Sequence, residues 1–134
     1  LAEGGVARLA DFGLAKSFQQ AGLSGMTATG MVAGTFQFMP REQLTSYRQA
    51  RPTTDVWSMA ATVYYLLTGE YARDFSSHPD PLAVILRGGT VPLRQRDPSV
   101  PADLAALVDR ALDDEPSRRF PTAREFVTAL RGVL

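Results

Sequence analysis

The chain has 134 residues, of which 45% are hydrophobic and 21% charged, so it fits one domain or part of one and wholesale disorder is excluded. Its 14 Lys and Arg residues balance its 14 Asp and Glu residues, which leaves no basic excess for binding nucleic acid. It has no Cys and one histidine, His78, which excludes disulfides, thiolate metal sites and sites built from several histidines.

The N-terminal part of the chain is predicted to contain a short strand followed by a long loop. Residues 6–10 are typical of a short strand that ends at Asp11-Phe12-Gly13. Residues 17–34 are rich in Gly, Ser, Thr, Gln and Ala and have no helical period, which indicates a loop. Because loops of this length are uncommon in compact domains, this loop is expected to be functional.

From Pro40 onward the pattern is helical. A brief helix is predicted over residues 41–46, and a longer helix over residues 54–68, apolar on most faces, is predicted to end at Gly69. Three further helices are marked by a cap or by an early proline, after Asp80, at Pro101 and after Thr122. The fold class is therefore mainly α, a helical bundle entered through a strand and a long loop.

No segment is apolar over a length that crosses a membrane. The most apolar run, residues 56–67, includes Ser58 and Thr62 and is shorter than the roughly 20 residues that a spanning helix needs. Residues 1–4 have neither the basic region nor the apolar stretch of a signal peptide, and they do not begin with Met. We therefore expect a cytoplasmic segment of a longer protein, with no membrane contact of its own.

Four short motifs follow one another at ordered distances. Asp11-Phe12-Gly13 alone is a weak signal, because an Asp that closes a strand before a glycine turn explains it equally well. Three more motifs follow it: Gly34-Thr35 with residues 36–42, Asp55-Val56-Trp57-Ser58, and Arg118-Arg119-Phe120. Together they resemble the second half of a eukaryotic-like serine/threonine protein kinase domain of the bacterial type. The resemblance covers essentially the whole chain.

The resemblance implies that residues 1–134 are a C-terminal lobe portion of the two-lobed α+β kinase fold. Residues 17–33 would be the activation loop and residues 54–68 the central helix. The N-lobe and the catalytic loop are absent, since the chain has no glycine-rich loop, no lysine before the Asp11 motif and no His-Arg-Asp motif. The implied function is transfer of phosphate from Mg-ATP to Ser or Thr of a protein substrate, with this fragment inactive without its N-lobe.

The resemblance also assigns the site that binds the cofactors ATP and Mg²⁺. Asp11 would bind the Mg²⁺ ion that bridges the ATP phosphates, because a carboxylate at the end of a rigid strand can hold such an ion. Phe12 would pack in the core and set the active or inactive geometry, and Gly13 would allow the main chain to flip. Lys16 follows this motif and cannot replace the missing lysine.

Three threonines are expected to take part in phosphate transfer or in its regulation. Thr27 and Thr29 lie where related bacterial kinases carry phosphothreonines, although two solvated loop threonines would look the same in sequence. Thr35 matches the threonine whose hydroxyl meets the catalytic Asp, which favours Ser/Thr over Tyr specificity.

Three charged residues are expected to be structural. Residues 40–42 read Pro-Arg-Glu where the family has Ala-Pro-Glu, so Glu42 is kept although the proline is displaced by one position. Glu42 is expected to pair with Arg119, whose spacing from Glu115 fits the family's arginine better than that of Arg118. Asp55 would hold the catalytic loop, although an acidic residue at a helix start is also explained by the helix dipole.

Two other classes of function compete with the active kinase. A pseudokinase or scaffold would use the same fold to bind protein partners, but it has little need of Asp11 and Thr35. An unrelated helical interaction domain would make the four ordered motifs accidental. An Asp-x-x-x-x-Asn loop immediately upstream would indicate an enzyme.

Overall fold

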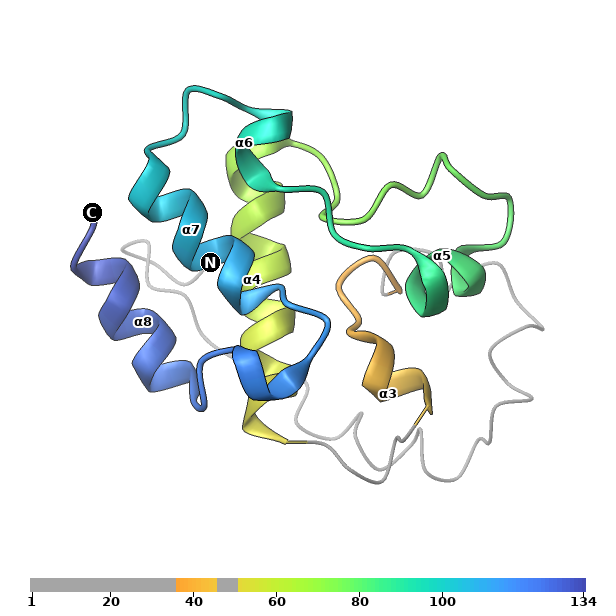
Figure 1. Cartoon of the computed structure of the whole chain (residues 1–134), viewed down its shortest axis with the longest axis horizontal. Coiled ribbons are helices and arrows are strands. Elements are labelled where there is room, and N and C mark those ends of the chain that lie inside the picture. Colours follow the sequence, from red (N-terminus) through yellow and green to blue (C-terminus); the bar gives the residue numbers. More distant parts are fainter. Residues whose placement is uncertain (1–35, 46–50) are drawn as a thin grey trace, which may run out of the picture. The chain divides into compact units, whose positions relative to one another are not determined.

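The computed structural model describes residues 36–45 and 51–134, which belong to a compact unit of residues 33–134. The predicted strand at residues 6–10 and the loop at 17–33 lie outside the described residues. Within these residues the secondary structure is helical, apart from an isolated antiparallel bridge between Arg73 and Thr90 (Figure 1). The mainly α fold class is therefore confirmed.

The longest described helix is α4, Pro52–Thr68, which begins two residues before the predicted start at residue 54. It begins early because proline fits the first helical position, where no backbone N–H is needed. Gly69 ends it in the left-handed conformation (φ 70°) that glycine adopts without a steric penalty, and its N–H donates to the Tyr65 carbonyl at 2.8 Å.

Helix α5, Pro81–Arg87, is capped as its sequence predicts. The Asp80 carboxylate accepts a hydrogen bond from the Leu82 N–H at 2.9 Å, and Pro81 occupies the first position. Gly88 ends the helix, where a Cβ atom would lie 2.6 Å from the Val84 carbonyl oxygen, so only glycine allows this close approach.

The C-terminal helices are α7, Ala102–Ala111, and α8, Ala123–Arg131, joined by a turn that contains the short 3₁₀ helix η3, Pro116–Arg118. Thr122 caps α8 by accepting a hydrogen bond from the Glu125 N–H at 3.2 Å, as its sequence predicts. The structure adds α6, Leu93–Arg96, whose four residues are too few to show a hydrophobic period.

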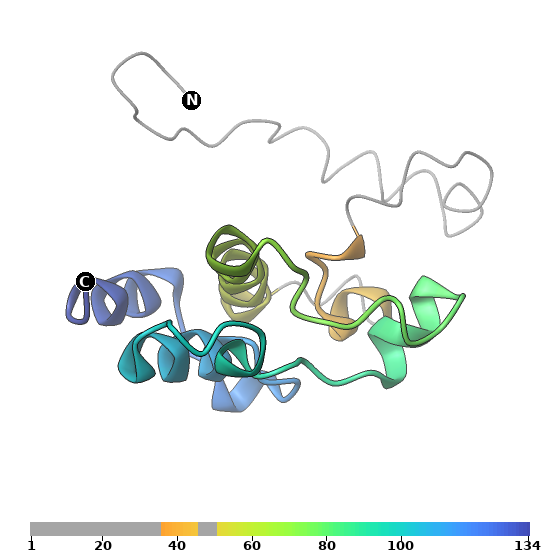
Figure 2. The same cartoon turned by 90° about the horizontal axis from the view of Figure 1, so that it is seen from above.

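The core forms where α4 packs against α7 and α8 (Figure 1), and α3, Arg41–Thr45, lies beside α5 (Figure 2). The Trp57 side chain of α4 is completely buried, and its indole N–H donates to the Leu112 carbonyl at 3.1 Å. This hydrogen bond fixes the end of α7, and with it the turn over residues 113–118, against α4. None of the helices in residues 36–45 and 51–134 is long and apolar enough to cross a membrane.

Candidate functional site

The described part of the predicted site is the segment of residues 36–42, which leads into α3. Its first turn is closed by a hydrogen bond from the Met39 N–H to the Phe36 carbonyl at 3.1 Å. Phe36 is buried, and Pro40 is among the fully buried side chains. The segment is thus packed into the unit, and the charged groups around it fix its main chain.

Glu42 and Arg119 form a bidentate ion pair, as the sequence predicts for these two residues. The guanidinium Nη2 of Arg119 donates to Glu42 Oε2 at 3.0 Å, and Nη1 donates to Oε1. The Arg119 side chain is fully buried, whereas that of Glu42 keeps 23% of its surface exposed. Two parallel charge-assisted bonds make this pair both strong and geometrically specific.

Arg119 also binds main-chain carbonyl groups on two other elements. Its Nε donates to the Asp113 carbonyl at 2.7 Å, and its Nη1 donates to the Thr53 carbonyl at 3.0 Å. The carbonyl of Thr53 belongs to the first turn of α4, whereas that of Asp113 belongs to the turn after α7. One guanidinium therefore joins α3, α4 and this turn.

A second cluster is centred on the Asp114 carboxylate, which lies between two guanidinium groups. Arg41 Nη2 donates to Asp114 Oδ2 at 2.7 Å, and Arg73 Nη2 donates to Asp114 Oδ1 at 3.0 Å. Arg41 also donates to the Gly88 carbonyl at 3.1 Å, which joins α3 to the end of α5. Residues 113–119 thus hold both charged residues that follow Pro40, Arg41 through Asp114 and Glu42 through Arg119.

Arg73 has the most buried charge of this second cluster, with none of its side chain exposed. Its guanidinium carbon lies 4.4 Å from the ring centroid of Trp57, and its Nη1 donates to the Met39 carbonyl at 3.1 Å. Burial lowers the pKa of the Arg73 guanidinium, while the neighbouring Asp114 carboxylate acts in the opposite direction. Arg73 stays charged, because guanidinium groups are not deprotonated in proteins.

Aromatic rings pack one side of the segment against the end of α4. Phe38 meets Tyr65 and Tyr71 edge-on, with ring centroids 5.9 and 5.8 Å apart, and these two tyrosines stack on each other at 5.1 Å. Edge-to-face and offset-stacked pairs are the favoured aromatic geometries. Apolar contacts at Phe38 and polar contacts at residues 39–42 therefore hold the same short segment.

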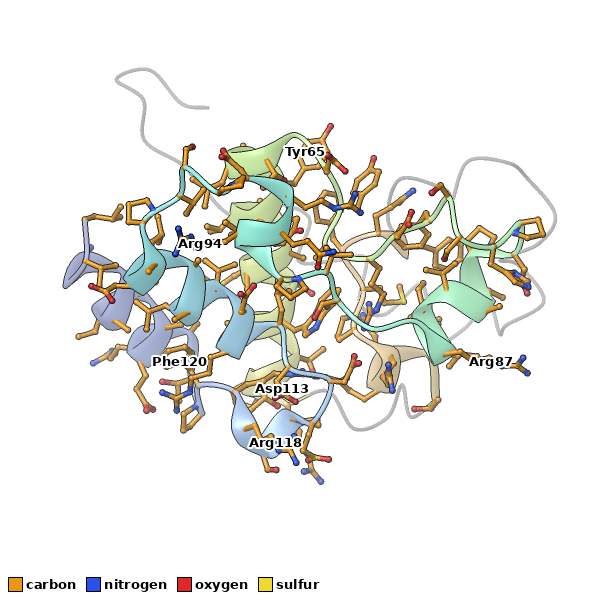
Figure 3. All side chains as sticks on the ribbon, turned by 45° about the horizontal axis from the view of Figure 1, so that its top comes forward. Tyr65, Arg87, Arg94, Asp113, Arg118 and Phe120 are labelled. Carbon is orange, nitrogen blue, oxygen red and sulfur yellow. The ribbon has the colours of Figure 1, made fainter. Side chains whose placement is uncertain are left out.

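Several predicted site residues lie outside the described residues: Asp11, Phe12, Gly13, Thr27, Thr29 and Thr35. Asp55 lies in the first turn of α4, where its side chain is exposed on this unit. Arg118 is on the turn after α7 with 73% of its side chain exposed, and Figure 3 shows it near Asp113, whose carboxylate is 4.0 Å away.

The metal site predicted at Asp11 is likewise not part of the described residues. In residues 36–45 and 51–134, no group of three or more His, Cys, Asp or Glu side chains is arranged to hold a metal ion. The described site fixes a segment of main chain, and the residues predicted from the sequence to carry phosphate transfer lie outside it.

Sequence reasoning missed Arg73 and Asp114. Arg73 stands in the loop after Gly69, where a charged residue is expected to face solvent. Asp114 follows Asp113, and no local pattern distinguishes one of these aspartates from the other. The only available signal was that Arg73 lies five residues after the end of a largely apolar helix. That signal does not identify the partner, which is 41 residues away.

Comparison with known proteins agrees with this architecture. The protein kinase domain model matches residues 1–129. The chain is 35% identical over 137 aligned residues to the serine/threonine-protein kinase PknK of Mycobacterium bovis. This alignment covers 99% of the chain and 12% of PknK. It is 33% identical to the serine/threonine-protein kinases drp72 of Corynebacterium efficiens and 32% identical to the tyrosine-protein kinase MasK of Myxococcus xanthus. Those alignments cover 96% and 97% of the chain but 24% and 20% of the relatives.

The chain therefore belongs to the protein kinase domain family, and its relatives include bacterial serine/threonine kinases. Members of this family use ATP and a divalent metal ion and act on protein substrates. The chain spans about an eighth to a quarter of the length of these relatives.

Proposed function

We propose that residues 1–134 are the C-terminal lobe part of an ATP-dependent protein serine/threonine kinase, called the complete kinase below. Residues 17–33 are its activation loop and residues 54–68 belong to its central helix. Asp11 holds Mg²⁺ on the ATP phosphates, with Phe12 and Gly13 beside it, and Thr35 faces the catalytic Asp of the upstream loop. The catalytic part lies in the cytoplasm, where ATP is available.

The observation that carries this proposal is the bidentate pair of Glu42 and Arg119. These residues stand in two motifs, 77 positions apart, that were matched to the kinase family separately. Their contact supports the register of both motifs, and hence the position of Thr35 seven residues before Glu42. Asp55 at the start of α4 is the third matched position, and we assign it to holding the catalytic loop.

Phosphate transfer by the complete kinase is the direct test. Incubated with Mg-ATP labelled on its terminal phosphate, it should label a general protein substrate on Ser and Thr. Purified residues 1–134 should transfer no phosphate, because positioning and electrostatics supply nearly all of this catalysis and the base and the ATP lysine are missing. Analysis of the phosphorylated amino acids is the measurement. Labelling only of tyrosine, or equal transfer by residues 1–134 alone, would contradict the proposal.

We further propose that the complete kinase phosphorylates itself on Thr27, Thr29 or both, and that this activates it. A phosphate adds about −1.5 to −2 charges and three acceptor oxygens, which can order a polar loop against an arginine. Peptide mass spectrometry of the active kinase should find phosphate within residues 17–33 and none on Thr35. Activity should fall in the Thr27→Ala/Thr29→Ala variant. Full activity in that variant would place the switch elsewhere.

A further inference from the structure

The segment of residues 39–42 is held at successive positions by different side chains. The Met39 carbonyl accepts from Arg73, the Arg41 guanidinium donates to Asp114, and the Glu42 carboxylate accepts from Arg119. Glu42 and Arg119 are matched to family motifs. Arg73 and Asp114 belong to none of the four motifs, so their role must be inferred from their contacts.

The burial of Arg73 needs a physical reason. A charged side chain with no exposed surface loses its hydration, and this cost is offset only by close partners. Arg73 has three such partners: the Asp114 carboxylate, the Trp57 ring and the Met39 carbonyl. Of these, only the Met39 carbonyl lies in the segment next to Thr35, and an apolar residue at position 73 could not bind it.

The partners of Arg73 are themselves rigidly held. Trp57 is completely buried and donates to the Leu112 carbonyl, and Asp114 follows Leu112 by two residues. Asp114 also binds Arg41, two residues after Met39. The main chain of residues 39–41 is therefore attached at both ends to a single rigid cluster made of Arg73, Asp114 and Trp57.

We propose that Arg73 is a positioning residue for the protein substrate: with Asp114 it fixes the main chain at Met39, and thereby the orientation of the segment that receives the substrate beside Thr35. This inference rests on the proposed function, because residues 39–42 can receive the protein substrate only if Thr35, a few residues before them, faces the catalytic Asp. The proposed function assigns ATP to Asp11, outside this segment, so loss of the Arg73 contacts should affect the protein substrate selectively.

Steady-state kinetics of the complete kinase with a protein substrate can test this selectivity. Arg73→Met keeps an unbranched apolar stem against Trp57 but removes the charge and all donors to Met39 and Asp114. It should raise KM for the protein substrate on the order of tenfold, the effect of one lost hydrogen bond to a charged group. KM for ATP should be unchanged. Arg73→Lys retains the charge and a donor. Its KM for the protein substrate should therefore lie between that of the unsubstituted kinase and that of Arg73→Met.

Arg96→Met is the matched control. Arg96 is also an arginine in an ion pair, with Glu70 at 2.7 Å, but 24% of its side chain is exposed, and it lies on α6. Its replacement also removes one arginine of an ion pair but leaves Met39 untouched, so KM for the protein substrate should stay at its original value. Thermal unfolding of each variant separates a loss of fold from a loss of positioning.

Three outcomes would overturn the inference: an unchanged KM for the protein substrate in Arg73→Met, an equal rise in KM for ATP, or the same rise in Arg96→Met. If Arg73→Met does not fold, Arg73→Lys and Asp114→Asn carry the test, and each should raise KM for the protein substrate alone. An unsubstituted complete kinase that transfers no phosphate would instead overturn the proposed function, and this inference with it. Active variants with unchanged KM overturn only the role of Arg73.

Discussion

Replacement of either partner of the Glu42–Arg119 pair should destabilise the complete kinase by about 3–5 kcal/mol. In Glu42→Ala the fully buried Arg119 guanidinium loses its carboxylate. In Arg119→Ala the carboxylate of Glu42 is left without this arginine, and the carbonyls of Asp113 and Thr53 lose a donor. Unfolding by urea, monitored by far-ultraviolet circular dichroism, measures the change in free energy.

Arg118→Ala is the matched control, because it removes an arginine from the adjacent position. The Arg118 side chain is mostly exposed and only 4.0 Å from its acidic neighbour, so its loss should cost about 0–1 kcal/mol. The destabilisation by Glu42→Gln should lie between that by Glu42→Ala and that by Arg118→Ala, since the amide keeps one acceptor but no charge. A loss for Arg119→Ala as small as the one expected for Arg118→Ala would mean that the pair does not stabilise the fold.

Asp11→Asn in the complete kinase should abolish phosphate transfer while leaving the fold intact. A neutral amide is a poor ligand for Mg²⁺, which prefers carboxylate and phosphate oxygens. Transfer of labelled phosphate to a protein substrate measures the loss, and the unfolding midpoint measures the fold. The rate is expected to drop to the background of the assay at saturating Mg-ATP.

Asp55→Asn is an informative companion variant. Because Asp55 is assigned to holding the catalytic loop and not to binding the metal, its replacement should lower the rate without changing the dependence on Mg²⁺ concentration. Near-normal activity of Asp11→Asn would show that the metal is held elsewhere and that the Asp11-Phe12-Gly13 motif is misassigned.

The helices could be predicted from the sequence because their ends are encoded locally. Asp80 with Pro81 marks the start of α5, and Thr122 with Glu125 marks the start of α8, through contacts between residues at most three positions apart. Helix α6 escaped prediction for the opposite reason, since four residues carry no periodic signal.

The site was predictable only where a family motif marked it. The sequence separates Arg119 from Arg118 by position within a motif, and the structure shows the two with opposite burial. No such motif marks Asp114. It nevertheless binds Arg73, which is 41 residues away in the sequence, and Arg41, which is 73 residues away. Contacts over such distances are set by the packing of α4 against α7, which no local pattern in the sequence expresses.

The charges around residues 39–42 do not sum to zero. The three guanidinium groups of Arg41, Arg73 and Arg119 face the two carboxylates of Glu42 and Asp114, which leaves one positive charge. Oriented main-chain dipoles compensate it, through the carbonyl oxygens that accept from these arginines on Gly88, Met39, Thr53, Asp113 and Asp114. Because the compensating dipoles are fixed and partly buried, dissolved ions screen them less than they screen the exposed pair of Arg118 and Asp113. The geometry of this segment should therefore change little with ionic strength.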